Sequence, residues 1–136
     1  MTATTITSAT TGTDSFLRFA MRLDAVLTGL MGIAGAALAP RIAEMSGTTT
    51  AFEYGMAAFF IGYGALVLGL ARMKHVRIPG IWVICGNVLY TVASVIFVLA
   101  GVFPLTTTGV VATLGAGVYT LVMADLQYMG VRRMRA

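Results

Sequence analysis

Long apolar runs alternate with short polar stretches along the chain after residue 15. Each run is about as long as the roughly 20 mostly apolar residues that an α-helix needs to cross a bilayer. The pattern predicts membrane spans at residues 16–39, 52–71, 81–103 and 106–129. We therefore expect an all-α membrane protein whose four transmembrane helices form an up-down-up-down bundle joined by short connections.

The segments outside these runs are polar. Residues 1–15 are rich in threonine, alanine and serine and have no apolar stripe, so we expect a disordered tail. Residues 40–51 contain Arg41, Glu44 and a run of threonines, which predicts a polar loop. Residues 132–136 predict a short basic tail.

Composition supports a membrane environment. The chain is 58% hydrophobic and only 10% charged, whereas a soluble domain carries about 25% charged residues. The predicted spans use nearly all of its 136 residues and leave no soluble domain to house an enzyme. No P-loop, CxxC or HExxH motif occurs, and the one histidine, His75, lies in a basic loop. We expect no enzymatic activity, no cofactor and no metal site.

The basic residues lie beside the spans and predict the orientation. Arg41 falls on one side of the predicted membrane. The other side holds Arg18, Arg22, Arg72, Lys74, Arg77, Arg132, Arg133 and Arg135. Because cytoplasmic loops carry an excess of Lys and Arg, this bias predicts cytoplasmic N- and C-termini in a bacterial plasma (inner) membrane. It also accounts for the net charge of +4 without a nucleic-acid partner.

Small residues recur at helical spacing in the first two spans. Gly29 and Gly32 share a face of the first span, and Gly55, Gly62 and Gly69 repeat every seven residues in the second. Such faces let two membrane helices approach closely. The stripe in the second span could pair with another protein chain or pack against a helix of the same chain, and we favour packing within the chain.

Five polar residues inside or near the spans are the candidate site, because polar and ionisable groups are costly in a membrane. They are Arg22, Asp24, Asn87, Asp125 and Gln127. In the predicted topology all five lie toward the cytoplasmic leaflet, so they could converge in one polar pocket.

Two interpretations of this cluster are open. It could be a substrate or proton site with Asp24 and Asp125 as protonatable groups, Arg22 as their charge partner and Asn87 as a hydrogen-bonding group. It could instead be an ion pair, Arg22–Asp125 or Arg18–Asp24, that holds the first and fourth helices together. We favour the ion pair, because no carboxylate falls near the middle of a predicted span, where a coupling site is expected.

Three tyrosines, Tyr63, Tyr90 and Tyr119, fall inside predicted spans, where their hydroxyls need hydrogen-bond partners. They could line a cavity or pack between helices. We favour packing.

Three stretches carry a resemblance to a known group: the run Arg22–Gly29, Asn87 in the third span, and the ending Ala124–Arg133. The chain after residue 15 resembles small bacterial four-span membrane proteins that are loosely DoxX-like in size and layout. The resemblance implies architecture rather than chemistry, and it singles out the same five polar residues.

Two functions are consistent with these features. The first, which we favour, is an accessory or scaffold subunit that binds a larger membrane complex, or further copies of itself, through small-residue faces in the lipid bilayer. The alternative is a small transporter or lipid-binding protein with a cytoplasm-facing polar pocket. Small multidrug transporters have this length and span number, but the predicted first span lacks their central carboxylate.

Overall fold

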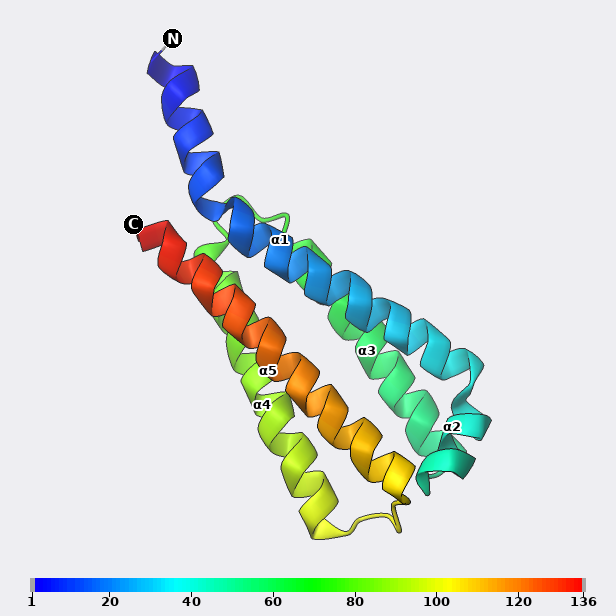
Figure 1. The fold of residues 1–136 in the computed structure, drawn as a ribbon. Helices are drawn as coiled ribbons and strands as arrows, with labels where there is room; N and C mark the ends of the chain where they lie inside the picture. The colour runs from blue at the N-terminus through cyan, green and yellow to red at the C-terminus, as the bar shows by residue number, and fades with distance from the viewer. Residues whose placement is uncertain (1, 136) are drawn as a thin grey trace.

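The computed structural model describes residues 2–135, and the side chains of residues 14–134. Over this range the chain folds into helices and contains no strand. The helices are α1 (Thr2–Ala37), α2 (Ala39–Ser46), α3 (Thr50–Leu70), α4 (Arg77–Ala100) and α5 (Thr107–Arg135). Figure 1 shows the long helices side by side, with the α3–α4 loop at one end and α2 and the α4–α5 turn at the other. The predicted all-α fold class is confirmed.

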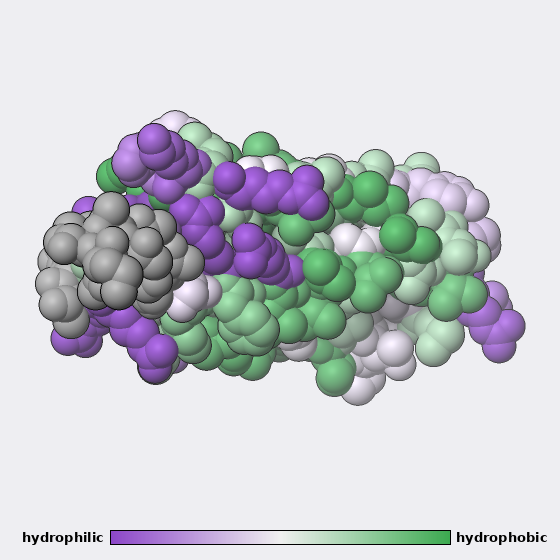
Figure 2. Space-filling model, turned by 90° about the horizontal axis from the view of Figure 1, so that it is seen from above, coloured by the Kyte–Doolittle hydropathy of each residue, from purple (hydrophilic) through white to green (hydrophobic). Residues whose placement is uncertain are grey.

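Within residues 2–135, four helices are long and apolar enough to cross a membrane. The candidate spans are Asp14–Ala37, Thr50–Leu70, Arg77–Ala100 and Thr107–Met134. Large apolar side chains point outward on them; Leu66 is 60% exposed and Leu99 is 80% exposed. Figure 2 shows hydrophobic residues along the middle of the molecule, whereas hydrophilic ones gather mainly at one end. This is the surface of a multi-pass membrane protein.

The structure differs from the prediction at both ends of the chain. Residues 2–15, predicted to be disordered, form the first turns of α1, and residues 132–135, predicted to be a tail, continue α5. No proline interrupts either segment. Once a helix has formed, each added residue gains a backbone hydrogen bond, so extending a helix costs less than starting one.

The predicted polar loop at residues 40–51 also needs correction, because it contains α2. Pro40 lies in the first turn of α2, where its missing N–H is not needed. Gly47 ends the helix with a φ of 81°, a left-handed conformation that favours glycine. Thr49 then caps α3, its Oγ1 accepting a hydrogen bond from the Phe52 N–H at 3.1 Å.

α1 is the central helix of the packing. It lies along α3 on one side and α5 on the other, and α5 in turn lies along α4. The backbones of α3 and α4 approach each other closely at few points, and side chains join the two helices: Phe52 stacks on Phe97, and the Tyr63 hydroxyl donates to Asn87. Gly64 of α3 allows α1 and α3 to approach closely, because a Cβ added at this position would lie 2.7 Å from the Ala25 carbonyl oxygen of α1.

The predicted packing glycines fall into two groups. Gly32 packs against α3, since an added Cβ would lie 2.8 Å from the Ala57 carbonyl oxygen, and Gly29 lies opposite Gly64. An added Cβ at Gly55, Gly62 or Gly69 would meet no described atom within 4 Å. These three are exposed, so the favoured prediction that they pack within the chain is wrong. We call their exposed face the α3 glycine stripe.

The buried hydrophobic core lies toward the end of the molecule that carries the α3–α4 loop. Its members come from the middle of α1, the ends of α3 and α5, the α3–α4 loop and the start of α4. They include Leu17, Met21, Val67, Val76, Val83 and Val131. This end of the helix assembly is therefore closed by packed apolar side chains.

Candidate functional site

A buried carboxylate stands at the centre of the candidate site. Asp24 of α1 is fully buried. Its Oδ2 accepts hydrogen bonds from Asn87 Nδ2 at 2.8 Å and from Gln127 Nε2 at 2.9 Å. Its Oδ1 accepts from Thr28 Oγ1 at 3.0 Å and from the Tyr119 hydroxyl at 3.1 Å. An ionised carboxylate offers about four acceptor sites, and here four neutral donors occupy them.

A second set of bonds joins these donors to one another. Asn87 Nδ2 also donates to Gln127 Oε1 at 3.0 Å, and the Tyr63 hydroxyl donates to Asn87 Oδ1 at 3.1 Å. We refer to these six residues as the Asp24 network; they are Asp24, Thr28, Tyr63, Asn87, Tyr119 and Gln127. All the candidate membrane spans contribute to it: α1, α3, α4 and α5. A fully bonded polar network fixes the relative positions of the helices that carry it.

Helical spacing explains how the sequence builds the network. Asp24 and Thr28 are four residues apart on α1, so they lie on one face, one turn above the other. Tyr119 and Gln127 are eight residues apart on α5, about two turns, and likewise share a face. Thr28 did not emerge as a candidate from the sequence, although its spacing from Asp24 was a usable signal.

Two of the predicted cluster residues do not join the network. Arg22 and Asp125 are both exposed. Each precedes a network residue by two positions, Asp24 and Gln127 respectively, and a step of two positions points to the opposite side of a helix. The predicted cluster is therefore right for Asp24, Asn87 and Gln127 and wrong for Arg22 and Asp125.

Neither of the favoured ion pairs, Arg22–Asp125 and Arg18–Asp24, forms among the described residues. Among residues 14–134 the ion pair that forms is Arg18–Asp14, at 3.1 Å within α1. Arg18 also donates to the carbonyl oxygens of Ala71 at 2.8 Å, Met73 at 2.7 Å and Lys74 at 3.0 Å. Its guanidinium thus holds the end of α3 and the following loop instead of pairing with Asp24.

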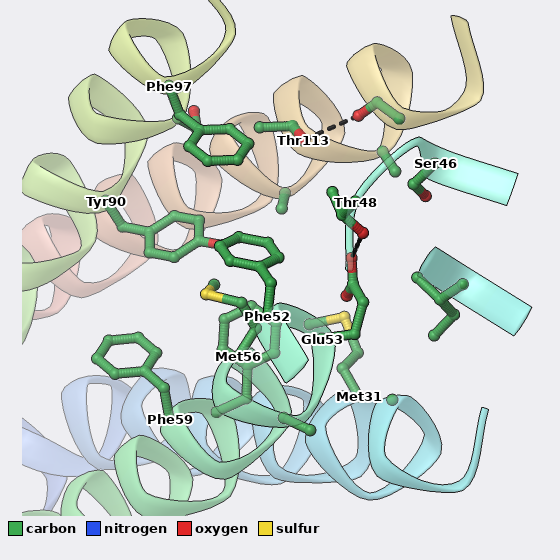
Figure 3. Close-up of a pocket in the computed structure, with 18 of the residues that line it drawn as sticks. Met31, Ser46, Thr48, Phe52, Glu53, Met56, Phe59, Tyr90, Phe97 and Thr113 are labelled. Carbon is green, nitrogen blue, oxygen red and sulfur yellow. Dashed lines mark hydrogen bonds between the residues drawn. The ribbon is translucent and has the colours of Figure 1, made fainter. Parts of the chain in front are cut away.

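A cavity of about 580 Å³ lies beside the network. Its lining comes from every described helix and is mainly apolar and aromatic. Figure 3 shows Phe52 and Phe59 of α3 and Tyr90 and Phe97 of α4 extending toward it from opposite sides. Phe52 and Phe97 stack, with ring centroids 5.4 Å apart. Aromatic rings therefore bridge the two helices, whose backbones approach each other closely at few points.

A second, smaller cavity of about 60 Å³ shares lining residues with this space and with the network. Both cavities are lined by Met31, Phe59, Phe60, Tyr90 and Ala116. The smaller one is also lined by four members of the network, Thr28, Tyr63, Asn87 and Tyr119. Tyr63, Tyr90 and Tyr119 thus line a cavity. Tyr63 and Tyr90 also pack between helices as predicted, since both stack on Phe59 and Tyr63 lies against the hydrophobic core.

The cavity lies on the side of Asp24 that faces α2, away from the basic α3–α4 loop. Ile42 and Ser46 of α2 belong to its lining. α2 is joined to the α4–α5 turn, because Thr106 Oγ1 donates to the Met45 carbonyl at 2.6 Å and the Thr106 N–H donates to the Ser46 carbonyl at 3.1 Å. On the other side of Asp24 lies the packed core. The Asp24 network therefore separates a closed end from a hollow one.

No group of three or more His, Cys, Asp or Glu side chains that could hold a metal ion occurs among the described residues. The polar groups that the structure assembles are instead amides, hydroxyls and one buried carboxylate.

Together, these features define an α-helical, multi-pass membrane protein with a buried polar network at the base of an apolar cavity. No family model, curated protein or solved structure matches this chain. The class of protein therefore rests on the fold and on the site themselves, and the DoxX-like resemblance stays a prediction.

Proposed function

We propose that this protein binds a small lipophilic molecule within the membrane, as a small transporter or a lipid-binding protein. The observation that carries the proposal is the cavity of about 580 Å³ with the Asp24 network at its base. Ligand sites in proteins measure about 300–1,000 Å³ and combine an apolar lining with a few polar groups that orient the ligand. The cavity has both properties.

The arrangement of α3 and α4 supports entry of the ligand from the lipid. The backbones of these helices approach each other closely at few points, and stacked aromatic side chains lie between them. Side chains exchange rotamers far faster than helices move. A lipophilic molecule in the bilayer can therefore reach the cavity by displacing rings rather than by separating packed helices.

The burial of Asp24 also favours this function over a scaffold role. Asp24 is fully buried within a candidate membrane span and bonds to residues of two further spans. Polar groups held inside a membrane are costly and commonly mark a substrate or ion pathway.

We further propose that the protein lies in a bacterial plasma membrane with both termini in the cytoplasm. The basic α3–α4 loop, and Arg132 and Arg133 near the end of α5, support this orientation. The cavity then occupies the outer half of the membrane, rather than facing the cytoplasm as the sequence predicts.

The proposal is tested by binding of the neutral lipophilic dye Nile red to the protein in lipid nanodiscs. Ala116 lines both cavities, so Ala116→Phe should fill the space and weaken saturable dye binding at least tenfold. Val118→Phe is the matched control, because Val118 lies on the same helix and is 62% exposed. Equal dye binding by the wild type and both variants would rule out the cavity as a ligand site.

A second candidate function, an accessory or scaffold subunit, is favoured by the α3 glycine stripe. Gly55, Gly62 and Gly69 have no described neighbour within 4 Å of an added Cβ, so another membrane helix could pack there. The stripe supports contact with a further copy of the chain or with a larger membrane complex.

Purification in a mild detergent, with mass spectrometry and light scattering, tests this candidate. Gly62→Leu should remove a bound partner or dissociate an oligomer. Gly115→Leu, on an equally open face of α5, is the matched control and should change nothing. A monomer without partners in the wild type would exclude the scaffold role under those conditions.

A further inference from the structure

The charges around the cavity are of one sign. Its described lining includes one carboxylate, Glu53, and no lysine, arginine or histidine. Glu53 lies near α2, where its Oε1 accepts a hydrogen bond from Thr48 Oγ1 at 2.6 Å. At the opposite end, Asp24 lies directly behind Thr28 and Tyr119 of the smaller cavity. A ligand in the cavity would therefore lie between two acidic groups.

The bonding of Asp24 leaves a place for a positive charge. Its described partners are two amides and two hydroxyls, and no basic side chain pairs with it. A buried charge without a counter-charge is unfavourable in a medium of low polarity, even when neutral donors surround it. A cation placed within a few ångströms would supply that missing attraction.

Two hydroxyl groups lie between Asp24 and the smaller cavity. Thr28 and Tyr119 each have one hydroxyl hydrogen. Both oxygens lie within 3.1 Å of Asp24 Oδ1 and 3.0 Å from each other, so each hydrogen can point to the carboxylate or to the other hydroxyl. When both hydrogens point to the carboxylate, the oxygen lone pairs are free to accept from another donor. An ammonium group in the smaller cavity would donate to these oxygens.

Aromatic rings complete the surroundings. Phe59 stacks on Tyr63 and Tyr90, with ring centroids 6.3 and 6.4 Å apart, and Phe60 lies 5.9 Å from Tyr90. Phe59, Phe60, Tyr63 and Tyr90 all line the smaller cavity. The faces of aromatic rings attract cations, and the attraction grows when water is excluded.

We propose that the ligand is an amphiphilic organic cation, whose ammonium group enters the smaller cavity beside Tyr119 and Thr28 and whose apolar body fills the larger one. The volumes of about 60 and 580 Å³ fit a small charged head on a larger apolar body. This inference rests on the proposed function, because it assigns a chemical class to the ligand of the same cavity.

Three ligands with one skeleton test the class: 4-phenylbutylammonium, the uncharged 4-phenylbutanol and the anion 4-phenylbutyrate. Binding to the wild type in nanodiscs of zwitterionic lipid is measured by calorimetry, with Ala116→Phe defining the part of the binding that belongs to the cavity. We expect the ammonium compound to bind at least tenfold more tightly than the alcohol, and the anion to bind more weakly than both.

Asp24→Asn should reduce the preference for ammonium over alcohol to about one. Glu53→Gln should reduce the same preference by a smaller factor. If Asp24→Asn does not fold, the wild-type preference and the Glu53→Gln result still test whether the ligand is a cation. Val118→Phe should retain the full preference.

The outcomes separate the two proposals. If the alcohol binds in the cavity as tightly as the ammonium compound, the cation assignment is wrong and the proposed function stands. If Asp24→Asn folds and keeps the full preference, the assigned role of Asp24 is wrong. If neither Nile red nor any of the three ligands binds in a way that depends on Ala116, the proposed function fails and this inference fails with it.

Discussion

Asp125 and Gln127 are two residues apart on α5, yet their surroundings are opposite. Asp125 is exposed, whereas Gln127 is fully buried and bonded to Asp24 and Asn87. The same contrast holds for Arg22 and Asp24 on α1. At the scale of single residues, the direction in which a side chain points decides whether it belongs to the site.

This contrast gives a prediction for stability. Gln127→Leu leaves Asp24 with one donor fewer and Asn87 with an unpaired amide hydrogen, so the free energy of unfolding should fall by about 1–3 kcal/mol. Asp125→Asn should change it by less than about 0.5 kcal/mol, as for other exposed substitutions. Unfolding in mixed micelles of increasing SDS content measures both. A large loss for Asp125→Asn would restore the ion-pair interpretation of that residue.

The extent to which the site could be predicted follows from the same geometry. Counting residues from the ends of a predicted span gives the depth of a side chain in the membrane. Depth alone correctly identifies Asp24, Asn87 and Gln127 as site residues. Depth cannot distinguish the faces of a helix, so Arg22 and Asp125 were included wrongly. The part played by Tyr63 and Tyr119 depends on which helices are neighbours, and that information comes from packing rather than from hydropathy.

At the scale of helices, α1 owes its central position to small residues on two partners. Gly64 of α3 lies against Ala25 and Gly29 of α1, and Gly130 of α5 lies against Leu17. The sequence pattern located the long helices, because apolar runs of spanning length are unambiguous. It missed α2, whose eight residues are shorter than a span and mix polar with apolar positions.

Gly62 and Gly64 provide a matched test of this packing. Gly64→Ala would place a Cβ against the backbone of α1, and we expect the free energy of unfolding to fall by about 1–3 kcal/mol. Gly62→Ala points into open space and should be neutral, or stabilising by up to about 1 kcal/mol, because alanine favours the helix. The SDS unfolding measurement applies again. Equal effects of the two substitutions would contradict the face assigned to each glycine.

At the scale of the whole molecule, the two ends differ in charge and in packing. The end with the α3–α4 loop is basic and closed by the core, whereas the end with α2 borders the cavity. The orientation proposed from the charges therefore also decides from which half of the membrane a ligand can enter.

Cysteine labelling in intact cells tests that orientation. Cys85 is the single cysteine, so Cys85→Ala provides a background without thiols. In it, Thr49→Cys at the α2 end should react with a membrane-impermeant maleimide, and His75→Cys in the basic loop should react only after the cells are permeabilised. The reverse pattern would invert the topology and place the cavity in the cytoplasmic half.

Between α3 and α4 the wall of the cavity consists of side chains, because the two backbones approach each other closely at few points. In a bilayer, acyl chains would lie against the rings that bridge α3 and α4, and so would form part of the boundary of the cavity. The lipid is then a component of the binding site as well as its solvent. The affinity measured for any ligand should accordingly change with the length and unsaturation of the acyl chains, even when the protein is unaltered.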